Sequence, residues 1–386
     1  MFKAEELFQN VTDKNHPDET VLTIIQGKGT LPREQAGRNI HYDDASLSNY
    51  KKVEQGDFII HLRSFEGGLE MANEAGIVSP AYTILRCKRP HSSLFYDAYF
   101  HTDEFINHNL SKSVEGIRDG RQISYEAFKW LGIPYCEPTE QEQISSLFSV
   151  LNERIAKQRN LVESLKKYKR GLSNSLFDRL SAGSESRLCI FGDMMTILQN
   201  NTFSRDNLSV GGNGVRNIHY GDVLIKYGAV LDLHSENVPV INAEQDISKF
   251  SALSYLRNGD VVFADTAEDY TVGKSTEIIG AENIAALSGL HTIPCRPQDS
   301  FAPMYLGYYF NSDYFKKQLY PMIQGTKVSS ISKSEIIKTK IIVPCLQEQT
   351  RIASIMSALD DRIDAAKHTT KDLIDLRSGL LQQLFI

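Results

Sequence analysis

The sequence contains one long segment twice, and this duplication constrains the fold more than any other feature. The segment ISYEAFKWLGI begins at Ile123, and its counterpart ISKSEIIKTKI begins at Ile331. From there the two copies stay in register, at an offset of 208 residues, to the end of the chain. The matching positions include Gln141 and Gln349, Leu151 and Leu359, Arg154 and Arg362, Ile155 and Ile363, Gly171 and Gly379, and Leu176-Phe177 and Leu384-Phe385. We therefore predict two equivalent halves within the 386 residues.

Shorter fragments repeat ahead of each copy of this tail. RNIHY occurs at 38–42 and again at 216–220, GDFII at Gly56 is matched by GDVVF at Gly259, and AYFHTDEF at Ala98 is matched by YYFNSDYF at Tyr308. The fragments follow the same order in both halves, while their offsets vary, as they do when loops gain or lose residues. The pattern indicates a globular unit that is present twice, each copy followed by one tail.

Each tail is predicted to form one long helix, because apolar residues recur at alternating steps of four and three. About 38 residues at about 1.5 Å each give a rod of roughly 57 Å. A helix with one apolar stripe needs a partner, and its duplicate is the nearest candidate. We expect an antiparallel pair, because a parallel pair would need a long return linker. The predicted seam runs through Ile144, Phe148, Leu151, Ile155, Gln158, Val162, Leu165, Lys169, Leu172 and Leu176, and through Ile352, Met356, Leu359, Ile363, Ala366, Thr370, Leu373, Arg377, Leu380 and Leu384.

A third apolar column flanks this seam. It consists of Leu147, Leu161 and Tyr168 in the first helix and of Ile355 and Leu376 in the second. These side chains either cover the adjacent globular units or form a docking face for a partner subunit, and the sequence leaves both readings open. Lys169 and Arg377 on the seam are expected to bury their aliphatic stems and to direct their charges outward.

The globular units are predicted to be rich in short strands. GDFIIHLR and GDVVFADT begin with a Gly-Asp turn and continue into β-branched and aromatic residues. One helix is expected at residues 98–109 and one at 304–318. The predicted class is α+β, with two mixed α/β domains separated by an antiparallel two-helix coiled coil and related by a pseudo-twofold internal repeat. The predicted segments are a first domain at 1–138, a central long helix at 139–180, a second domain at 181–346 and a C-terminal long helix at 347–386.

Charge and cysteine content narrow the functional classes. The formal net charge of -6 argues mildly against a general nucleic-acid binder, although residues 139–180 hold 8 basic and 5 acidic side chains. The five cysteines are far apart and form no CxxC pair, so free thiols are favoured over zinc ligands or disulfides. No apolar run is long enough to span a membrane, and the acidic N-terminal stretch is unlike a signal peptide. A cytoplasmic location is expected.

The order of these features resembles the specificity (S) subunits of type I restriction-modification systems. The resemblance rests on two strand-rich units, each followed by a P…EQ element and a helix that ends in G-L-x-x-x-L-F. These signatures run from Pro138 to Phe177 and from Pro344 to Phe385. The loops GIRDGRQIS at Gly116 and GTKVSSIS at Gly325 add weaker support.

The resemblance implies a function and a set of partners. Each globular unit would be a target recognition domain that reads one half of a split double-stranded DNA sequence. The helices would set the spacing and seat two methylation subunits, which transfer a methyl group from S-adenosylmethionine to adenine. A restriction subunit can join them. The S subunit itself would be non-catalytic and would hold no cofactor, so that S-adenosylmethionine, ATP and Mg would be bound by the partner subunits.

The residues themselves offer little sign of catalysis. An amino-methyltransferase needs an Asn/Asp-Pro-Pro-aromatic loop, and none occurs. TVGKST at Thr271 contains Gly-Lys-Ser, but a P-loop also needs a glycine where Glu268 stands. His41 and His219 recur within RNIHY, yet neither has partners at metal-ligand spacing in both copies, so no metal site is predicted.

Arginine and lysine in polar or glycine-rich loops are the best candidates for DNA contact, because they bind both phosphates and guanine. The candidates are Lys28, Arg33, Arg63, Arg118 and Arg121 in the first domain and Arg205, Lys274 and Lys327 in the second. Arg38 and Arg216 belong to RNIHY in both domains, which favours a scaffold role or a phosphate contact over base reading. Residues 221–258 have no counterpart of equal length in the first half and either add contacts or only decorate the domain.

Two other functions compete with DNA reading. The chain could be a duplicated coiled-coil scaffold that organises other proteins, or an enzyme that uses the GKST segment. Sequence-selective DNA binding distinguishes the first reading from the scaffold, and nucleotide turnover that depends on Lys274 would identify the enzyme.

Overall fold

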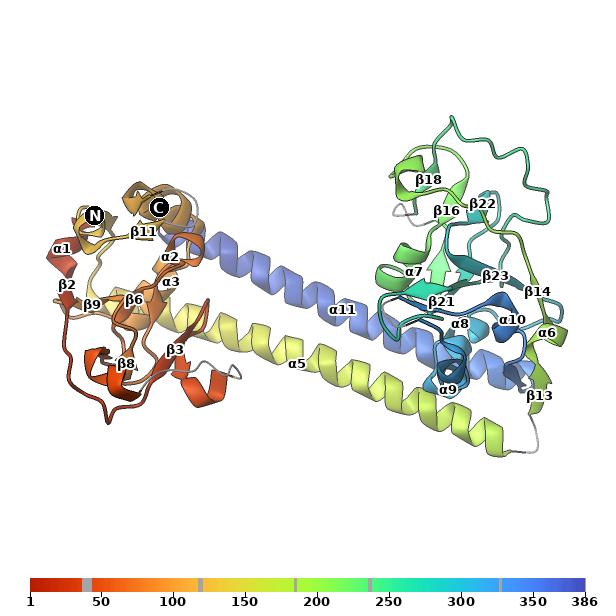
Figure 1. Cartoon of the computed structure of the whole chain (residues 1–386), viewed down its shortest axis with the longest axis horizontal. Coiled ribbons are helices and arrows are strands. Elements are labelled where there is room, and N and C mark those ends of the chain that lie inside the picture. The colour runs from red at the N-terminus through yellow and green to blue at the C-terminus, as the bar shows by residue number, and fades with distance from the viewer. Residues whose placement is uncertain (37–43, 117–120, 184–185, 235–237, 326–327, 386) are drawn as a thin grey trace. The chain divides into compact units, whose positions relative to one another are not determined.

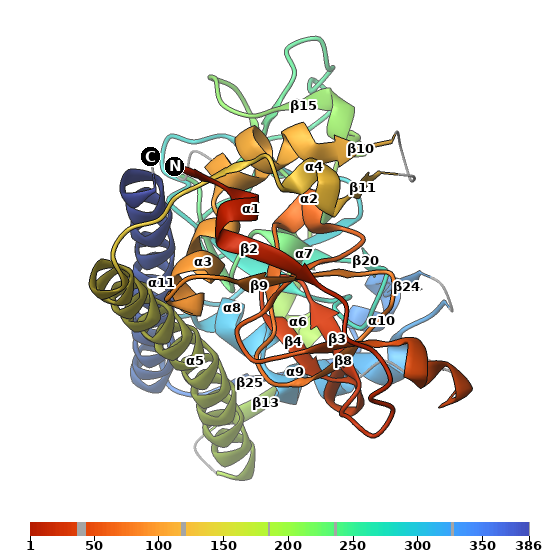
Figure 2. The ribbon, with the colours of Figure 1, turned by 90° about the vertical axis from the view of Figure 1, so that its left-hand side faces the viewer.

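The computed structural model describes residues 1–36, 44–116, 121–183, 186–234, 238–325 and 328–385 (Figure 1, Figure 2). These residues form two compact units. Unit 1 comprises Met1–Asn160 and Ala366–Ile386, and unit 2 comprises Leu161–Ala365. Each unit combines small sheets and short helices with one segment from each of two long helices, which confirms the predicted α+β class.

Unit 1 is built around an antiparallel four-stranded sheet in the order β2-β9-β6-β7. Four two-stranded pairs surround this sheet, namely β1-β12, β3-β4, β5-β8 and β10-β11. The elements of unit 1 that precede the long helix are β1 (Phe2–Lys3), α1 (Ala4–Leu7), β2 (Phe8–Val11), β3 (Leu22–Ile25), β4 (Gly29–Pro32), η1 (Arg33–Ala36), η2 (Asp44–Asn49), β5 (Lys51–Val53), β6 (Phe58–Ile60), α2 (Ser64–Gly67), β7 (Glu70–Met71), β8 (Gly76–Val78), β9 (Thr83–Cys87), α3 (Ser93–Phe100), η3 (Glu104–Asn109), η4 (Leu110–Ser113), β10 (Val114–Glu115), β11 (Gln122–Ile123), α4 (Tyr125–Phe128) and β12 (Gly132–Ile133).

Unit 2 contains a five-stranded sheet in the order β14-β23-β19-β21-β17 and a four-stranded sheet in the order β15-β18-β16-β22. The pairs β13-β25 and β20-β24 complete it. The elements that lie between the two long helices are β13 (Arg187–Ile190), α6 (Phe191–Met194), β14 (Met195–Ile197), η6 (Arg205–Asn207), β15 (Leu208–Ser209), β16 (Arg216–Ile218), α7 (Tyr220–Ile225), β17 (Val230–Asp232), β18 (Val240–Ile241), β19 (Val261–Ala264), β20 (Thr266–Ala267), β21 (Ser275–Ile279), β22 (Ala286–Ser288), β23 (Thr292–Pro297), α8 (Tyr305–Phe310), α9 (Asp313–Leu319), η7 (Tyr320–Met322), β24 (Ser329–Ser330), α10 (Lys333–Ile336) and β25 (Lys340–Val343).

The two long helices are α5 (Pro138–Ala182) and α11 (Leu346–Leu384), and each contributes to both units. In unit 1 the Phe148 ring stacks on that of Phe385, and Gln158 donates to the Ala366 carbonyl. In unit 2 Lys169 donates to Asp360. Numbering therefore rises along α5 as it falls along α11, so the two helix segments are antiparallel within each unit. Neither helix, nor any other in the described part of the chain, is long and apolar enough to cross a bilayer.

The heptad reading of these helices holds at most positions. The predicted seam residues are buried or half-buried, with one exception: Leu384 is 42% exposed. At the end of α11 the buried positions are Leu381 and Phe385 instead. The seam ends early there because the helix meets the aromatic core of the globular domain, which accepts a different face.

Repeated phenylalanines anchor the ends of the long helices. Phe177, near the end of α5, packs on Tyr305 and Tyr309 in unit 2 at ring distances of 6.2 and 5.3 Å. Phe385 packs in the same way on Phe95 and Tyr99 in unit 1, at 5.0 and 5.4 Å. The helix that follows the first domain is thus anchored in unit 2, and the helix that follows the second domain is anchored in unit 1.

The start of each long helix is tied to its own domain by a buried glutamine from the repeated EQ pair. Gln141 accepts from the backbone of Ser92 at 2.9 Å and donates to the Cys136 carbonyl. Gln349 accepts from the backbone of Ala302 at 2.9 Å and donates to the Pro344 carbonyl. At each junction, one glutamine side chain therefore satisfies one backbone donor and one backbone acceptor.

The single helix expected at 98–109, and its counterpart at 304–318, was a wrong prediction. Each is broken in two by a hydroxyl side chain. Thr102 donates to the Tyr99 carbonyl and accepts from the backbone of Phe105. Ser312 makes the same two bonds in unit 2, which end α8 and begin α9. A hydroxyl that bonds to the local backbone competes with the helical pattern, and here it prevails.

Candidate nucleic-acid interface

The repeated Gly-Asp turn holds the same ion pair in both units. In unit 1 the guanidinium of Arg86 donates twice to the buried carboxylate of Asp57, at 2.9 and 2.7 Å. In unit 2 Arg296 donates twice to Asp260 at the same two distances. Burial raises the pKa of Asp260 despite this arginine. These bidentate pairs join the start of a central strand to its neighbour and provide a common frame for the loops.

Lys28, a predicted DNA contact, is exposed in the tight turn between β3 and β4. The buried carboxylate of Glu70 fixes this turn, because it accepts hydrogen bonds from the backbone N–H of Gly27 at 2.6 Å and of Gly29 at 2.8 Å. Asn73 donates to the Lys28 carbonyl at 2.7 Å. Gly29 has a φ of +76°, and a Cβ there would lie 2.5 Å from a backbone oxygen, so the turn requires glycine. The sequence reading did not identify Glu70 or Asn73.

His101 pairs with Glu70, its Nε2 lying 3.4 Å from the carboxylate. Burial raises the pKa of Glu70, but hydrogen bonds from His101 and from the glycine amides outweigh it, and the net shift is downward. Burial likewise lowers the pKa of His101, and the bond to Glu70 reverses that shift upward. The turn that carries Lys28 therefore rests on a half-buried ion pair.

The other predicted DNA contacts in the described part of the first domain are Arg33, Arg63 and Arg121. Arg33 is half-buried and begins η1, directly after β4. Arg63 is exposed and precedes α2. Arg121 is exposed, and its guanidinium lies over the ring of Phe65 in α2, at 4.3 Å. Arg63 and Arg121 are thus brought to the same helix, although the sequence separates them widely.

In the second domain a buried carboxylate holds Arg205. Its Nη1 donates to Asp222 at 2.6 Å, and Lys226 binds the other oxygen of that carboxylate at 3.0 Å. The Nη2 of Arg205 lies 3.4 Å from Nδ1 of His219. Burial and the neighbouring Arg205 lower the pKa of His219. Two cations are therefore fixed at one surface position, with the arginine side chain half exposed.

The second copy of RNIHY forms a junction between a strand and a helix. Arg216 lies in β16 and donates to the Val238 carbonyl at 3.4 Å. Asn217 is buried and accepts from the side chain of Asn201, while His219 accepts from the backbone of Gly221 at the start of α7. The first copy, with Arg38, lies outside the described residues. A role shared by the two copies therefore stays a prediction.

Lys274 is half-buried, and its ammonium donates to the carbonyl of Leu224 near the end of α7, at 2.9 Å. Burial lowers its pKa. The residues after it form strand β21, whereas a phosphate-binding P-loop leads into a helix. This arrangement argues against nucleotide binding by the GKST segment. The other two predicted cations, Arg118 and Lys327, lie outside the described residues.

The predicted partner-docking column is largely uncovered. Leu147 and Leu376 in unit 1, and Leu161 and Tyr168 in unit 2, are between 41% and 59% exposed. Ile355 in unit 2 is half-buried. Within each unit the globular domain therefore leaves most of this column free for another molecule. On the seam beside it, Lys169 lies over the ring of Tyr308 at 5.1 Å, in addition to its pair with Asp360.

Comparisons with known proteins agree with this arrangement. Residues 192–375 match the family described as Type I restriction modification DNA specificity domain. The HsdS subunit from Thermoanaerobacter tengcongensis has a similar structure, with a TM-score of 0.51 and 19% identity, covering 100% of this chain and 95% of that one. The S subunit of the Type-I restriction-modification system from M. genitalium gives 0.54 and 15%, over 100% and 95%.

A further structure describes complex assembly and conformational transition of the type I R-M system. It matches with a TM-score of 0.60 and 18% identity, over 100% of this chain and 96% of that one. At these identities the three solved structures bear on the fold alone.

Proposed function

Because this chain belongs to the family of type I restriction-modification DNA specificity subunits, we propose that each of its two globular domains reads one half of a two-part DNA sequence. The two domains share a frame but differ in the loops that it carries. The Asp57–Arg86 and Asp260–Arg296 pairs are the same in both. The additional strands differ between the domains: the first has the β3-β4 hairpin, and the second has the β15-β18-β16-β22 sheet. Unlike readers on a common frame would give an asymmetric target.

The observation that carries this proposal is the placement of cations by buried acids. Glu70 holds the turn with Lys28, and Asp222 holds Arg205. The backbone that carries Lys28 and the side chain of Arg205 are thus fixed before binding, so they lose less conformational entropy when they contact DNA. A chain with a net charge of -6 can bind DNA through such local cations, particularly when partner subunits add positive surface.

The long helices are proposed to set the distance between the half-sites and to seat two methylation subunits. The exposed column supports docking because it recurs in each unit, with Leu147 and Leu376 in one and Leu161 and Tyr168 in the other. A repeated face suits two copies of one partner. A similar structure is described in terms of complex assembly in a type I system, which agrees with a multisubunit role.

The chemistry is proposed to reside on the partners. The methylation subunits would bind S-adenosylmethionine and modify adenine, and a restriction subunit that joins them would use ATP and Mg. The present chain would supply recognition and assembly. The alternative of a non-catalytic scaffold without DNA readout keeps the helices but assigns no sequence preference to the two domains.

A randomised duplex library separates these two functions. The complex of this chain with its methylation subunit is incubated with the library at two salt concentrations, and the bound duplexes are sequenced. We expect salt-sensitive binding with a bipartite sequence preference. Salt-sensitive binding without any preference would favour the scaffold.

Domain exchange tests the division of labour. Replacing residues 1–138 with the matching domain of another family member should change one half of the preferred sequence and leave the other unchanged. Lengthening both helices by one turn should widen only the gap. Unchanged specificity after the exchange would contradict the proposal.

A further inference from the structure

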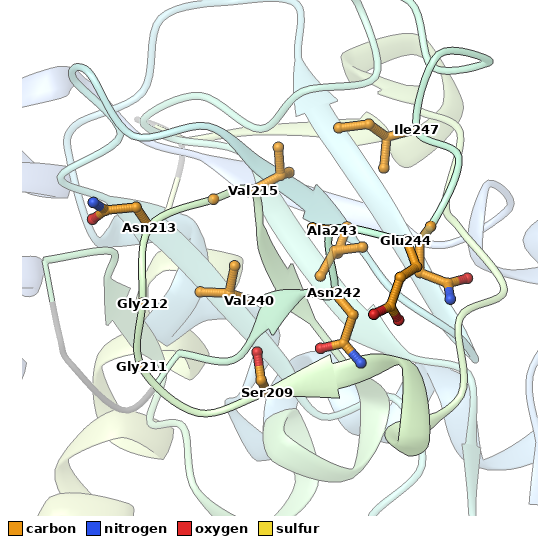
Figure 3. A pocket seen from close by; sticks show the side chains of 13 residues that line it. Ser209, Gly211, Gly212, Asn213, Val215, Val240, Asn242, Ala243, Glu244 and Ile247 are labelled. Carbon is orange, nitrogen blue, oxygen red and sulfur yellow. The ribbon is translucent and has the colours of Figure 1, made fainter.

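Unit 2 contains an open groove of about 660 Å³ beside the sheet β15-β18-β16-β22 (Figure 3). One wall is the glycine-rich loop that leads from β15 to β16, and the other is β18 with the residues that follow it. In Figure 3, Val240 and Val215 lie between Asn213 on the loop and Asn242 on the opposite wall. The groove is lined by Ser209, Gly211, Gly212, Asn213, Gly214, Val215, Val240, Ile241, Asn242, Ala243, Glu244, Gln245 and Ile247.

The glycine loop is shaped to pass close over the strand. Gly211, Gly212 and Gly214 all have positive φ values, of 81°, 94° and 155°. A Cβ at Gly214 would lie 2.6 Å from a methyl carbon of Val240. The groove therefore depends on glycine at this crossing, both for backbone conformation and for space.

The lining is apolar at its centre and carries amides on both walls. Val215, Val240 and Ile247 supply methyl groups, and the amides come from Asn213 on the loop and from Asn242 and Gln245 on the opposite wall. None of the thirteen lining residues is a lysine or arginine, and Glu244 is acidic. Such a surface is poorly suited to phosphate, which favours cations and backbone N–H groups. It suits an uncharged ligand that offers both hydrogen-bonding groups and apolar surface.

The two amides on the wall that follows β18 are held differently. The side chain of Asn242 donates to the Asp206 carbonyl at 3.2 Å, and its backbone N–H donates to the Asn207 carbonyl, so its position is fixed. The backbone of Gln245 donates to the Asn242 carbonyl at 3.0 Å. In the described residues the side chain of Gln245 has no hydrogen-bond partner, although it is half-buried. The amide atoms of Gln245 are not among the buried unpartnered atoms of the described residues, so they reach solvent and are accessible to a ligand.

Base edges in the DNA major groove match this chemistry. A glutamine or asparagine amide can bind N6 and N7 of adenine with two hydrogen bonds, and aliphatic side chains contact the methyl group of thymine. We propose that this groove reads an A·T base pair in the half-site of the second domain. Gln245 is its main determinant, Asn242 assists, and the valines face the thymine methyl group. This inference rests on the proposed function.

The groove predicts which half of the target it governs. β18 and the residues after it belong to the stretch 221–258, which has no counterpart of equal length in the first half of the sequence. The A·T position that Gln245 reads should therefore lie in the half-site of the second domain, apart from the adenine that a methylation subunit modifies in each half-site. A domain exchange at residues 1–138 should leave this position in place.

Substitution at Gln245 tests the proposal in the complex with the methylation subunit, at fixed salt. The base preference at each target position is measured by sequencing bound duplexes for the wild type, Gln245→Ala, Gln245→Glu and the control Gln298→Ala, which alters an exposed glutamine outside the groove. We expect Gln245→Ala to reduce discrimination at one A·T position by about 5- to 150-fold, the range for one good bidentate base contact. Gln245→Glu should shift that position toward C·G, because a carboxylate accepts from the cytosine amino group.

The other outcomes are also decisive. Wild-type preferences in both Gln245 variants would overturn the proposal, as would a uniform loss of affinity at every position or a change at a G·C pair. In each of these cases a selective wild-type complex leaves the proposed function intact. A wild-type complex without any preference would instead contradict the proposed function, and the inference with it.

Discussion

The anchoring of α11 in unit 1 predicts a localised loss of stability when Phe385 is replaced by alanine. Phe385 is 6% exposed and contacts the rings of Phe95, Tyr99 and Phe148 at 5.0, 5.4 and 6.4 Å. A buried Phe→Ala change costs about 3–5 kcal/mol. Because Phe385 lies just beyond the last residue of α11, where the backbone can adjust around the cavity, we expect the lower value of about 3 kcal/mol. For a unit of this size that corresponds to roughly 6–12 °C in the melting temperature.

Hydrogen exchange measured by mass spectrometry is the appropriate assay, because a chain with two units need not unfold in one step. Peptides from unit 1 should lose protection in Phe385→Ala, while peptides from the globular part of unit 2 should not. Leu384→Ala is the matched control, because the neighbouring leucine is 42% exposed. The mirror variant Phe177→Ala should loosen unit 2. Equal effects of Phe385→Ala and Leu384→Ala, or an equal loss in both units, would refute the reasoning.

Three further predictions follow from the site. Asp260→Asn should destabilise unit 2 by about 3 kcal/mol, because it leaves Arg296 without its buried carboxylate. Calorimetry should show this loss relative to the exposed control Asp246→Asn, and equal effects of the two variants would contradict the prediction. The His101–Glu70 pair should stabilise the Lys28 turn most between about pH 4.5 and 6.5. The pKa of His101 is raised, so its stabilising contribution is lost as the pH rises through that pKa. The pKa of Glu70 is lowered, so its contribution is lost as the pH falls through that pKa. An NMR titration should place the His101 pKa above its ordinary value and show that Glu70→Gln lowers it; an unshifted pKa would disprove the pairing. Tyr168→Glu should weaken binding of the methylation subunit at least about tenfold. Tyr270→Glu, on an exposed loop of the same unit, should leave this binding unchanged. Equal binding by both variants would exclude the exposed apolar column of the long helices as the docking face.

The long helices could be predicted from sequence because their burial is periodic. The heptad pattern identified the seam from Phe148 to Leu176 and from Ile352 to Ala366. The repeat also contained the LF ends, but the sequence did not show that their phenylalanines anchor the helices. The pattern failed where tertiary contacts outweigh the period. Leu384 is exposed because the aromatic core takes Leu381 and Phe385 instead. The helix expected at 98–109 is broken because the Thr102 hydroxyl bonds to the local backbone, and no periodic signal reports such a bond.

The candidate cations could be chosen from the sequence, and their contact with DNA stays a prediction. The residues that hold these cations in place could not be predicted, because they are distant from the cations in sequence. Glu70 supports Gly27 across more than forty residues, and Lys274 donates to the carbonyl of Leu224. The repeated Gly-Asp turn contained one usable signal, since an arginine follows in each half at a similar distance, at Arg86 and Arg296. The groove with Gln245 gave no signal, because amides and valines occur in every domain and only the fold brings these together.

Mapping of methylated adenines across the DNA of a cell that carries this chain and its partners tests the central claim most directly. We expect one asymmetric motif, with two specified parts separated by an unspecified gap of fixed length. The half read by the second domain should contain a further specified A·T pair besides its methylated adenine. A continuous motif, two identical halves or methylation without any motif would contradict it.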